Sequence, residues 1–251
     1  MPPNPAGGGD LDARHLAIHT AFDALAWACA GALAWALSHS VRLDFPVDDK
    51  RRPAYYATLA FSAGVGAYMF GTLNLIACGM PGLARSIEGA IFGAIFGVEL
   101  YKRWAGVTGR TGARFAAPLA IGVVIGRFGC YFSGIDDFTY GTPTSLPWGH
   151  DFGDGVMRHP APLYESGAMA LFLVAYLVEA LRGNRYVIDN GLYLAVLFYA
   201  VQRFAWEFVK PYAPVLGPLT VFQLLAITLA AYASYMLISA PRTSDERAVL
   251  A

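Results

Sequence analysis

Two arginines placed inside long apolar stretches are the residues of this sequence best suited to chemistry. Arg127 is the only charged residue between Ala116 and Phe132, and Arg203 lies with Glu207 inside a second apolar stretch. A charged side chain at membrane depth costs roughly 2.5 to more than 10 kcal/mol, so such residues usually face a polar interior and mark a binding site. The guanidinium group also matches the geometry of phosphate. The two arginines therefore predict a site for an anionic molecule among membrane helices.

The second apolar stretch carries a stripe of polar residues spaced four apart. Tyr199, Arg203 and Glu207 have this spacing, which places them on one face of a helix. Lys210 continues the stripe toward the outer interface. Arg203 and Glu207 could form a structural pair that neutralises itself. The two arginines and Lys210 nevertheless carry more positive charge than Glu207 neutralises, so an anionic ligand would complete the balance.

A third polar group, Arg158-His159-Pro160, precedes another apolar stretch. His159 titrates near neutral pH and could act as a general base, although a histidine before a proline at a helix start more often orients a neighbour or caps the helix. Tyr164 could hydrogen-bond this entrance or line the site. Glu165 could do the same, or could simply complement the positive end of the helix dipole.

The composition is that of a membrane protein with several spans. Of the 251 residues, 56% are hydrophobic and 14% are charged. The net charge is zero, so the charge of the whole chain says nothing about nucleic acid or acidic partners, and we expect no nucleic acid partner. The three cysteines Cys29, Cys78 and Cys130 lie in apolar segments without metal-binding spacing, so we expect no disulfide framework and no zinc site. We also expect no nucleotide or redox cofactor, because the sequence lacks a phosphate-cradling glycine loop.

Seven segments are long and apolar enough to predict helices of an all-α polytopic membrane protein, since a span needs about 20 mostly apolar residues. They are residues 16–38, 55–77, 86–101, 113–134, 162–181, 190–210 and 218–239. These helices form a single transmembrane domain at residues 16–239, between a disordered N-terminal tail at 1–15 and a cytoplasmic tail at 240–251. Three glycines spaced four apart in the third segment predict close packing against another helix: Gly89, Gly93 and Gly97.

The positive-inside rule orients these segments. Twelve of the eighteen Lys and Arg residues fall in the connections after the first, third and fifth segments and in the C-terminal tail. With seven spans these connections all lie on one side of the membrane. We therefore expect an outside N-terminus, a cytoplasmic C-terminus, and an outside position for the long connection at residues 135–161.

Taken in order, these residues resemble the prolipoprotein diacylglyceryl transferase family of bacterial membrane enzymes. Agreement in order and spacing extends over about residues 86–225. Each motif is weak alone, but the combination is specific. The motifs are Ile125-Gly126-Arg127-Phe128-Gly129-Cys130-Tyr131-Phe132, Gly141-Thr142-Pro143-Thr144 with Trp148, Arg158-His159-Pro160-Ala161-Pro162-Leu163-Tyr164-Glu165, Tyr199-Ala200-Val201-Gln202-Arg203 with Glu207, and Thr220 with Gln223.

The sequence departs from the family at three polar positions, as in a diverged paralogue. Glu88-Gly89-Ala90 stands where the family has a His-Gly-Gly motif, Ala21 where it has a tyrosine, and Cys130 where it has an asparagine. These departures leave open the acceptor and the base that deprotonates it. Glu88 or His159 could replace the missing histidine. Cys130 could be an internal nucleophile, or simply a small packed residue in the helix core.

The resemblance implies a multi-pass transferase of the bacterial cytoplasmic (inner) membrane. Such an enzyme moves diacylglyceryl from phosphatidylglycerol, or a related anionic phospholipid, to a lipobox cysteine thiol or another acceptor, and releases glycerol phosphate. The alternatives are a phospholipid-binding or transport protein that kept the phosphate clamp without catalysis, and a purely structural membrane subunit. We expect catalytic roles for Arg127, Arg203, Glu88 and His159, and substrate contacts from Arg127, Gly141, Arg158, Tyr164, Tyr199, Arg203 and Glu207.

Overall fold

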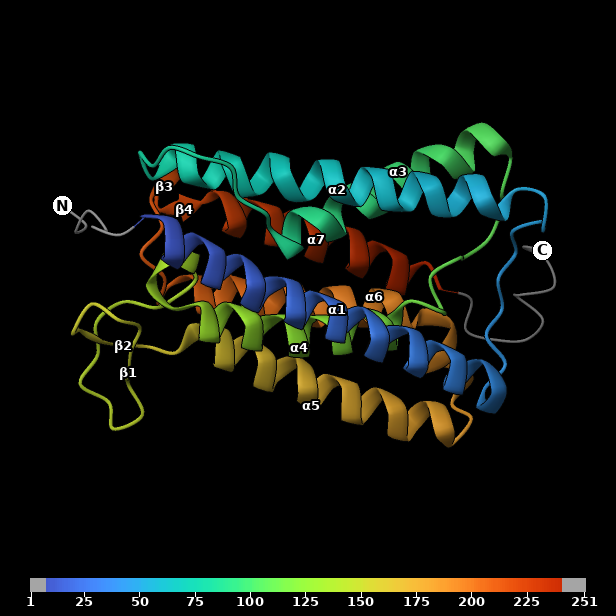
Figure 1. Ribbon diagram of the computed structural model, residues 1–251. Helices are drawn as coiled ribbons and strands as arrows, with labels where there is room; N and C mark the ends of the chain where they lie inside the picture. Colours follow the sequence, from blue (N-terminus) through green and yellow to red (C-terminus); the bar gives the residue numbers. More distant parts are fainter. Residues whose placement is uncertain (1–7, 241–251) are drawn as a thin grey trace.

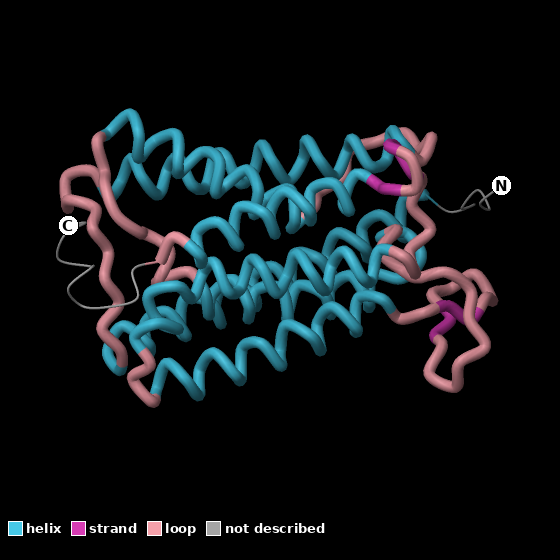
Figure 2. Tube along the Cα trace, turned by 180° about the vertical axis from the view of Figure 1, so that it is seen from behind, coloured by secondary structure: helices cyan, strands magenta, loops and turns pink. Residues whose placement is uncertain are grey.

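Seven long α-helices form one bundle in the computed structural model, which describes residues 8–240, with side chains from residue 16 onward (Figure 1). The helices are α1 (Gly8–Ser40), α2 (Arg52–Ala77), α3 (Ile87–Ala105), α4 (Ala116–Ser133), α5 (Ala161–Leu181), α6 (Arg185–Glu207) and α7 (Val221–Ile238). The short elements are the 3-10 helix η1 (Gly134–Asp137), the antiparallel pair β1 (His150–Asp151) and β2 (Met157–Arg158), and the antiparallel pair β3 (Pro214–Leu216) and β4 (Leu219–Thr220). Both strand pairs lie at the end of the bundle where α1 begins, whereas α7 ends at the opposite end (Figure 2).

Helices α2 and α3 pack backbone to backbone. A side chain on Gly93 would overlap the backbone oxygen of Ser62 in α2, and Gly89 carries the same constraint against the neighbouring turn of α2. This close approach confirms the packing predicted from the glycine spacing of this segment. The ends of α3 are also set by sequence: the Ser86 side chain accepts a hydrogen bond from the Gly89 N–H at 3.2 Å, and Gly106 ends the helix with φ 64°.

The main hydrophobic core lies between α4, α5, α6 and α7. It includes the fully buried side chains of Ala120, Met169, Tyr199 and Leu229. Helix α1 packs along α4, while α2 and α3 both reach α7. Large apolar side chains remain exposed around the outside of the bundle, for example Trp27, Phe61, Leu171 and Ile238. An apolar outer surface of this kind is typical of helices that face lipid.

The helices confirm the mostly helical fold, and every predicted span overlaps one of them. Among the described residues, five helical segments are long and apolar enough to cross a bilayer: residues 16–40, 52–77, 116–137, 161–181 and 221–238. Helices α3 and α6 are not among them: α3 carries Glu88, Glu99, Lys102 and Arg103, and α6 carries Arg185, Asp189, Arg203 and Glu207.

Several predicted boundaries were wrong. Helix α1 begins at Gly8, inside the stretch predicted as a disordered tail; residues 1–7 and 241–251, which hold the remainder of both predicted tails, lie outside the described residues. Helix α6 ends at Glu207, and the β3–β4 hairpin fills the connection to α7. Lys210 therefore lies in this connection and does not extend the helical stripe of α6.

Candidate functional site

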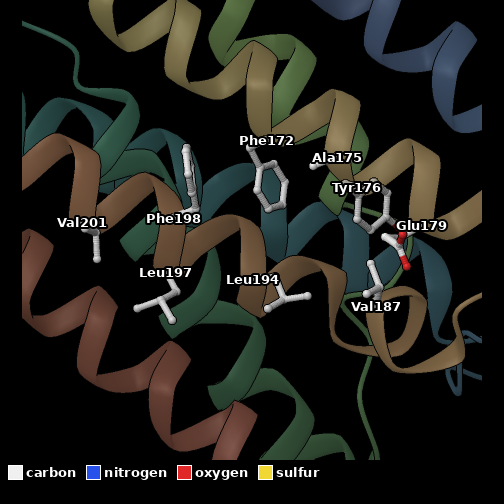
Figure 3. A pocket seen from close by; sticks show the side chains of 9 residues that line it. All are labelled: Phe172, Ala175, Tyr176, Glu179, Val187, Leu194, Leu197, Phe198 and Val201. Atoms are coloured by element: carbon white, nitrogen blue, oxygen red, sulfur yellow. The ribbon is translucent and has the colours of Figure 1, made fainter.

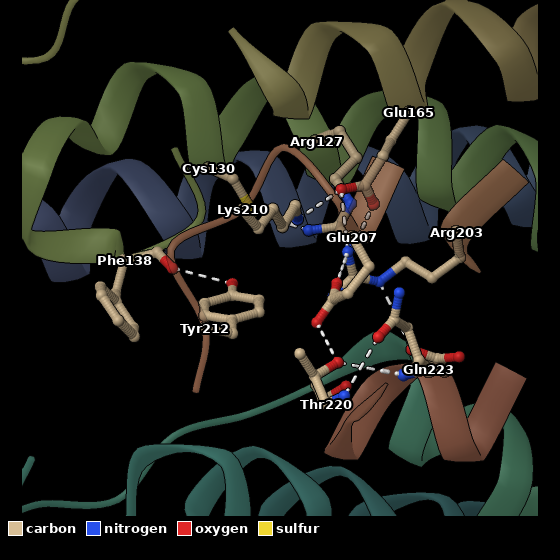
Figure 4. A network of polar contacts seen from close by, with 12 residues as sticks. Arg127, Cys130, Phe138, Glu165, Arg203, Glu207, Lys210, Tyr212, Thr220 and Gln223 are labelled. Atoms are coloured by element: carbon tan, nitrogen blue, oxygen red, sulfur yellow. Dashed lines mark hydrogen bonds and ion pairs between the residues drawn. The ribbon is translucent and has the colours of Figure 1, made fainter. Parts of the chain in front are cut away.

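Six buried charged residues from α3, α4, α5, α6 and the connection after α6 meet inside the bundle. All six side chains are at most 9% exposed. We call them the buried charge cluster; its cations are Arg127, Arg203 and Lys210, and its anions are Glu88, Glu165 and Glu207. Figure 4 shows the side chains of Arg127, Glu165 and Lys210 pointing toward one another, with Arg203 and Glu207 of α6 beside them.

Glu165, on the first turns of α5, is the centre of the buried charge cluster. Its carboxylate lies 2.6 Å from Nη2 of Arg127, 3.5 Å from Nη1 of Arg203 and 2.5 Å from Nζ of Lys210. Two guanidinium groups from α4 and α6 thus converge on one carboxylate. Glu165 does not merely complement the helix dipole, because its side chain is fully buried among three cations.

Arg203 contacts all three carboxylates of the cluster. Its Nη1 lies 2.7 Å from Oε2 of Glu207, one turn further along α6, and its Nε lies 3.4 Å from Oε2 of Glu88 on α3. The guanidinium carbon also lies 4.8 Å from the centroid of the Phe222 ring, a cation–π distance. This side chain is therefore fixed from α3, α5, α6 and α7 together.

The residues at the start of α7 hydrogen-bond to a carboxylate of the cluster. Thr220 donates its hydroxyl hydrogen to Glu207 Oε1 at 2.8 Å. The Thr220 hydroxyl oxygen also accepts a hydrogen bond from the Gln223 N–H, and the Gln223 side chain accepts one from the Thr220 N–H, which completes a capping box. The N-cap residue of α7, Thr220, is therefore also the residue that orients Glu207.

The buried charge cluster balances its own charge. Three cations face three carboxylates, so the cluster is neutral when every member is ionised. The expectation that Glu207 alone opposes three cations was wrong, because Glu88 and Glu165 are buried in the same place. An outside anion is therefore not required for charge balance.

Tyr199 lies on α6 one turn from Arg203, as its spacing predicted, and is fully buried. Its hydroxyl has no hydrogen-bond partner within the described part of the chain. A buried hydroxyl without a partner costs about 1–3 kcal/mol, so this group is available to a ligand that enters the cluster.

Arg158 is held within the connection between η1 and α5 and does not join the cluster. Its Nη2 lies 2.6 Å from Oδ2 of Asp154, and its guanidinium carbon lies 4.9 Å from the centroid of the Tyr140 ring. The hydrogen bonds from Arg158 lower the pKa of the Asp154 carboxyl, and burial raises the pKa of the Tyr140 hydroxyl.

His159 and Gly141 lie in the connection between η1 and α5, and Tyr164 lies in the first turn of α5. His159 Nδ1 lies 3.3 Å from the Tyr164 hydroxyl, which accepts a hydrogen bond from Nε1 of Trp148 at 2.8 Å. The Gly141 N–H donates to the His159 backbone oxygen at 2.9 Å, and a side chain at Gly141 would overlap the backbone of Val209 and the His159 side chain. These residues thus form a second polar group, and among the described residues no ion pair or side-chain hydrogen bond joins it, or Arg158, to Arg127 or Arg203.

A third polar group joins α1, α4 and η1, and sequence reasoning missed it. His19, Cys130 and Asp137 place one potential ligand atom each within 4.8 Å of one another. His19 Nε2 lies 2.5 Å from Oδ1 of Asp137, although the two residues are 118 apart in the chain. Gly129 permits this approach, because a side chain there would overlap Phe22 of α1. Since no local spacing marks residues so far apart, the sequence offered no signal for this group.

An apolar groove on the outside of α5 and α6 is unrelated to these polar groups. It has a volume of about 430 Å³ and is lined by side chains such as Phe172, Leu194, Leu197 and Phe198, with Glu179 as its charged member (Figure 3). No member of the buried charge cluster lines it. Its walls suit an apolar chain better than a chemical reaction.

Comparisons with known proteins agree with the motifs. The family described as prolipoprotein diacylglyceryl transferase matches residues 52–239. A phosphatidylglycerol–prolipoprotein diacylglyceryl transferase of Nitratidesulfovibrio vulgaris is 34% identical over 61% of this chain and 59% of its own length. A relative of the same name from Solidesulfovibrio magneticus is 33% identical over 72% of this chain and 69% of its own length. Another from Chromohalobacter salexigens is 34% identical over 58% of this chain and 56% of its own length. No solved structure shows significant similarity to this chain.

Proposed function

Since this chain belongs to the prolipoprotein diacylglyceryl transferase family, we propose that it is a membrane enzyme that transfers diacylglyceryl from phosphatidylglycerol to the cysteine thiol of a prolipoprotein. Glycerol phosphate is the other product. The observation that carries the proposal is the convergence of Arg127 and Arg203, on separate helices, upon the single buried carboxylate of Glu165.

In this proposal the lipid phosphate binds where the Glu165 carboxylate lies. A phosphodiester carries one negative charge and accepts hydrogen bonds from guanidinium groups as a carboxylate does. Exchange of the carboxylate for the phosphate keeps the buried charge cluster neutral, which favours a lipid with one anionic phosphate. Lys210, 2.5 Å from Glu165, and the unpartnered hydroxyl of Tyr199 supply two further donors.

The chemical step is a displacement at carbon. The thiolate sulfur attacks the glyceryl carbon that bears the phosphate ester; the S–C bond forms as the C–O bond breaks, and the electron pair goes to the phosphate oxygen. Negative charge therefore grows on the departing phosphate, and fixed guanidinium groups stabilise the transition state more than the ground state. Removal of one such donor costs about 100- to 1,000-fold in kcat in comparable sites.

Glu88 stays the candidate for carrying the thiol proton inside the cluster, since it is buried and 3.4 Å from Arg203. His159 is less suited, because its described contacts are to Tyr164 at the start of α5 and to Gly141 in the connection before it. We assign Arg158, Tyr164 and Gly141 to the recognition of substrate at the mouth of the site.

We also propose how the chain is placed in the membrane. All seven helices cross the membrane, with the start of α1 outside and the end of α7 in the cytoplasm. Two observations support it: α1 begins and α7 ends at opposite ends of the bundle (Figure 1), and the connections rich in Lys and Arg lie at the end where α7 finishes. The family relationship favours the bacterial inner membrane.

The test is turnover of labelled phosphatidylglycerol by purified protein in nanodiscs, with and without a lipobox peptide. We expect release of labelled glycerol phosphate and a thioether-linked peptide. Arg127→Ala and Arg203→Ala should each lower this rate at least about 100-fold, whereas Arg182→Ala should not, because Arg182 is 71% exposed at the far end of α5.

Normal turnover in either of the Arg127 and Arg203 variants would contradict the phosphate site. Lipid binding by the wild type without release of glycerol phosphate would instead support the alternative of a non-catalytic phospholipid-binding protein.

A further inference from the structure

The group formed by His19, Cys130 and Asp137 has the composition of a metal site. It combines an imidazole, a thiol and a carboxylate, which together are typical ligands of Zn²⁺. The three side chains come from α1, α4 and η1, so three separate segments bring them together. The His19 and Asp137 side chains are only 14% and 10% exposed, so the group is shielded but still near the surface.

The distances suit a small tetrahedral ion after minor side-chain rotation. Zinc bonds of about 2.0 to 2.3 Å place neighbouring ligand atoms about 3.3 to 3.8 Å apart. The three potential ligand atoms lie within 4.8 Å of one another. The closest pair, His19 Nε2 and Asp137 Oδ1 at 2.5 Å, has the separation of a hydrogen bond, so a metal ion would take the place of the shared proton.

The surroundings of the group fit a bound divalent cation. Thr139 Oγ1 donates a hydrogen bond to Asp137 Oδ2 at 2.5 Å, the kind of outer contact that orients a carboxylate ligand. One Cys130 thiolate and one Asp137 carboxylate would neutralise a divalent ion. This neutrality matters because Arg127 Nη1 lies 3.9 Å from Cys130 Sγ, and a site with net positive charge would repel it.

We propose that His19, Cys130 and Asp137 bind a divalent ion of the zinc class, and that the acceptor thiol is its fourth ligand. Metal binding itself does not depend on the transferase reaction; the identity of the fourth ligand rests on the proposed function. Catalytic zinc sites use three protein ligands and take water or substrate in the fourth position.

A metal at this position would prepare the thiol beside the lipid phosphate. A thiol that coordinates Zn²⁺ loses its proton, which passes to solvent, and becomes the thiolate nucleophile. Arg127 links the two halves of the reaction, because its guanidinium lies 3.9 Å from Cys130 Sγ and 2.6 Å from the Glu165 carboxylate that marks the phosphate position. The thiolate sulfur then forms the S–C bond while the C–O bond to phosphate breaks. In this arrangement Glu88 orients Arg203 and is not needed as the base.

The first experiment measures metal binding without reference to activity. Full-length protein in nanodiscs is titrated with Co²⁺, and thiolate-to-cobalt charge transfer is recorded in the near ultraviolet. We expect the band in the wild type and in Cys29→Ser, a matched control because Cys29 lies on α1 outside the group. We expect its loss in Cys130→Ser and weaker cobalt binding in Asp137→Asn, with unchanged elution and unfolding temperature as checks of folding.

Cobalt binding without a thiolate band, or an unchanged band in Cys130→Ser, would overturn the metal site. In that case the contact between His19 and Asp137 would only fasten α1 to η1.

The second experiment tests the fourth ligand. A lipobox peptide should intensify the charge-transfer band of cobalt-loaded protein, and the same peptide with serine in place of cysteine should not. Chelation should abolish peptide modification, and Zn²⁺ should restore it. An unchanged spectrum, or full transfer by metal-free protein, would overturn the inference and leave the proposed function standing. Metal binding in a protein that never releases glycerol phosphate would instead reject the proposed function and, with it, the role assigned to the thiol.

Discussion

Glu165→Gln removes the negative charge on which the buried charge cluster converges while keeping the size of the side chain. The wild-type carboxylate lies 2.6 Å from Arg127, 3.5 Å from Arg203 and 2.5 Å from Lys210. Without it, three cations face two carboxylates, so the cluster gains a net positive charge inside the bundle. Loss of one partner from a buried ion pair typically costs about 3–5 kcal/mol. On the usual scale for a chain of this size, the unfolding temperature then falls by roughly 6 to 20 °C.

The assay is thermal unfolding of wild type and variant in nanodiscs made either of phosphatidylcholine alone or with phosphatidylglycerol. If the anionic lipid binds the same donors as Glu165, phosphatidylglycerol raises the unfolding temperature of Glu165→Gln more than that of the wild type, because no carboxylate competes. Glu179→Gln is the matched control: this carboxylate is 38% exposed at the other end of α5, and such pairs contribute about 0–1 kcal/mol. Unchanged stability in Glu165→Gln, or equal stabilisation of both proteins by the lipid, would refute the reasoning.

Further substitutions test the packing of α3 on α2, the cap of α7, and the connection between η1 and α5. Gly93→Ala should destabilise the protein by about 1–3 kcal/mol in thermal unfolding, because its side chain would overlap α2; Gly122→Ala, where no atom lies within 4 Å, should not, and equal effects would refute the close packing. Thr220→Val should cost about 1–3 kcal/mol, since it removes the cap of α7 and a hydrogen bond to the cluster; an unchanged unfolding temperature would contradict this. The lowered pKa of Asp154 means that its pair with Arg158 stabilises the loop fully above the ordinary aspartate pKa of about 3.9 and loses this contribution as the pH falls through the lower folded value. Proteolysis of the loop should therefore accelerate on acidification in the wild type but not in Asp154→Asn; an identical pH profile would count against the pair.

The helices and the placement of the two arginines could be predicted from the sequence because both depend on local composition. An apolar stretch long enough to span a bilayer predicts a helix, and Arg127 within such a stretch predicts a polar interior. The glycine spacing of α3 predicted its contact with α2 for the same reason: the pattern lies within one helix.

Contacts between distant segments could not be predicted in this way. Glu207 was predicted as the only anion beside the cations because it shares a helix with Arg203, whereas Glu88 and Glu165 reach the cluster from other helices. A fully buried glutamate needs a cation, but its partner is set by packing and not by spacing. The residues after Glu207 were predicted to continue α6, although Pro211 and Pro214 mark the turn that brings Lys210 back toward Glu165.

The phosphate site can be tested most directly by a structure of the protein with phosphatidylglycerol bound. We predict that the lipid phosphorus lies between the guanidinium groups of Arg127 and Arg203, with phosphate oxygens within hydrogen-bonding distance of both and Glu165 displaced from its present position. A head group bound instead at Arg158 and Tyr140, between η1 and α5, with Glu165 still between the two arginines, would contradict the proposed function.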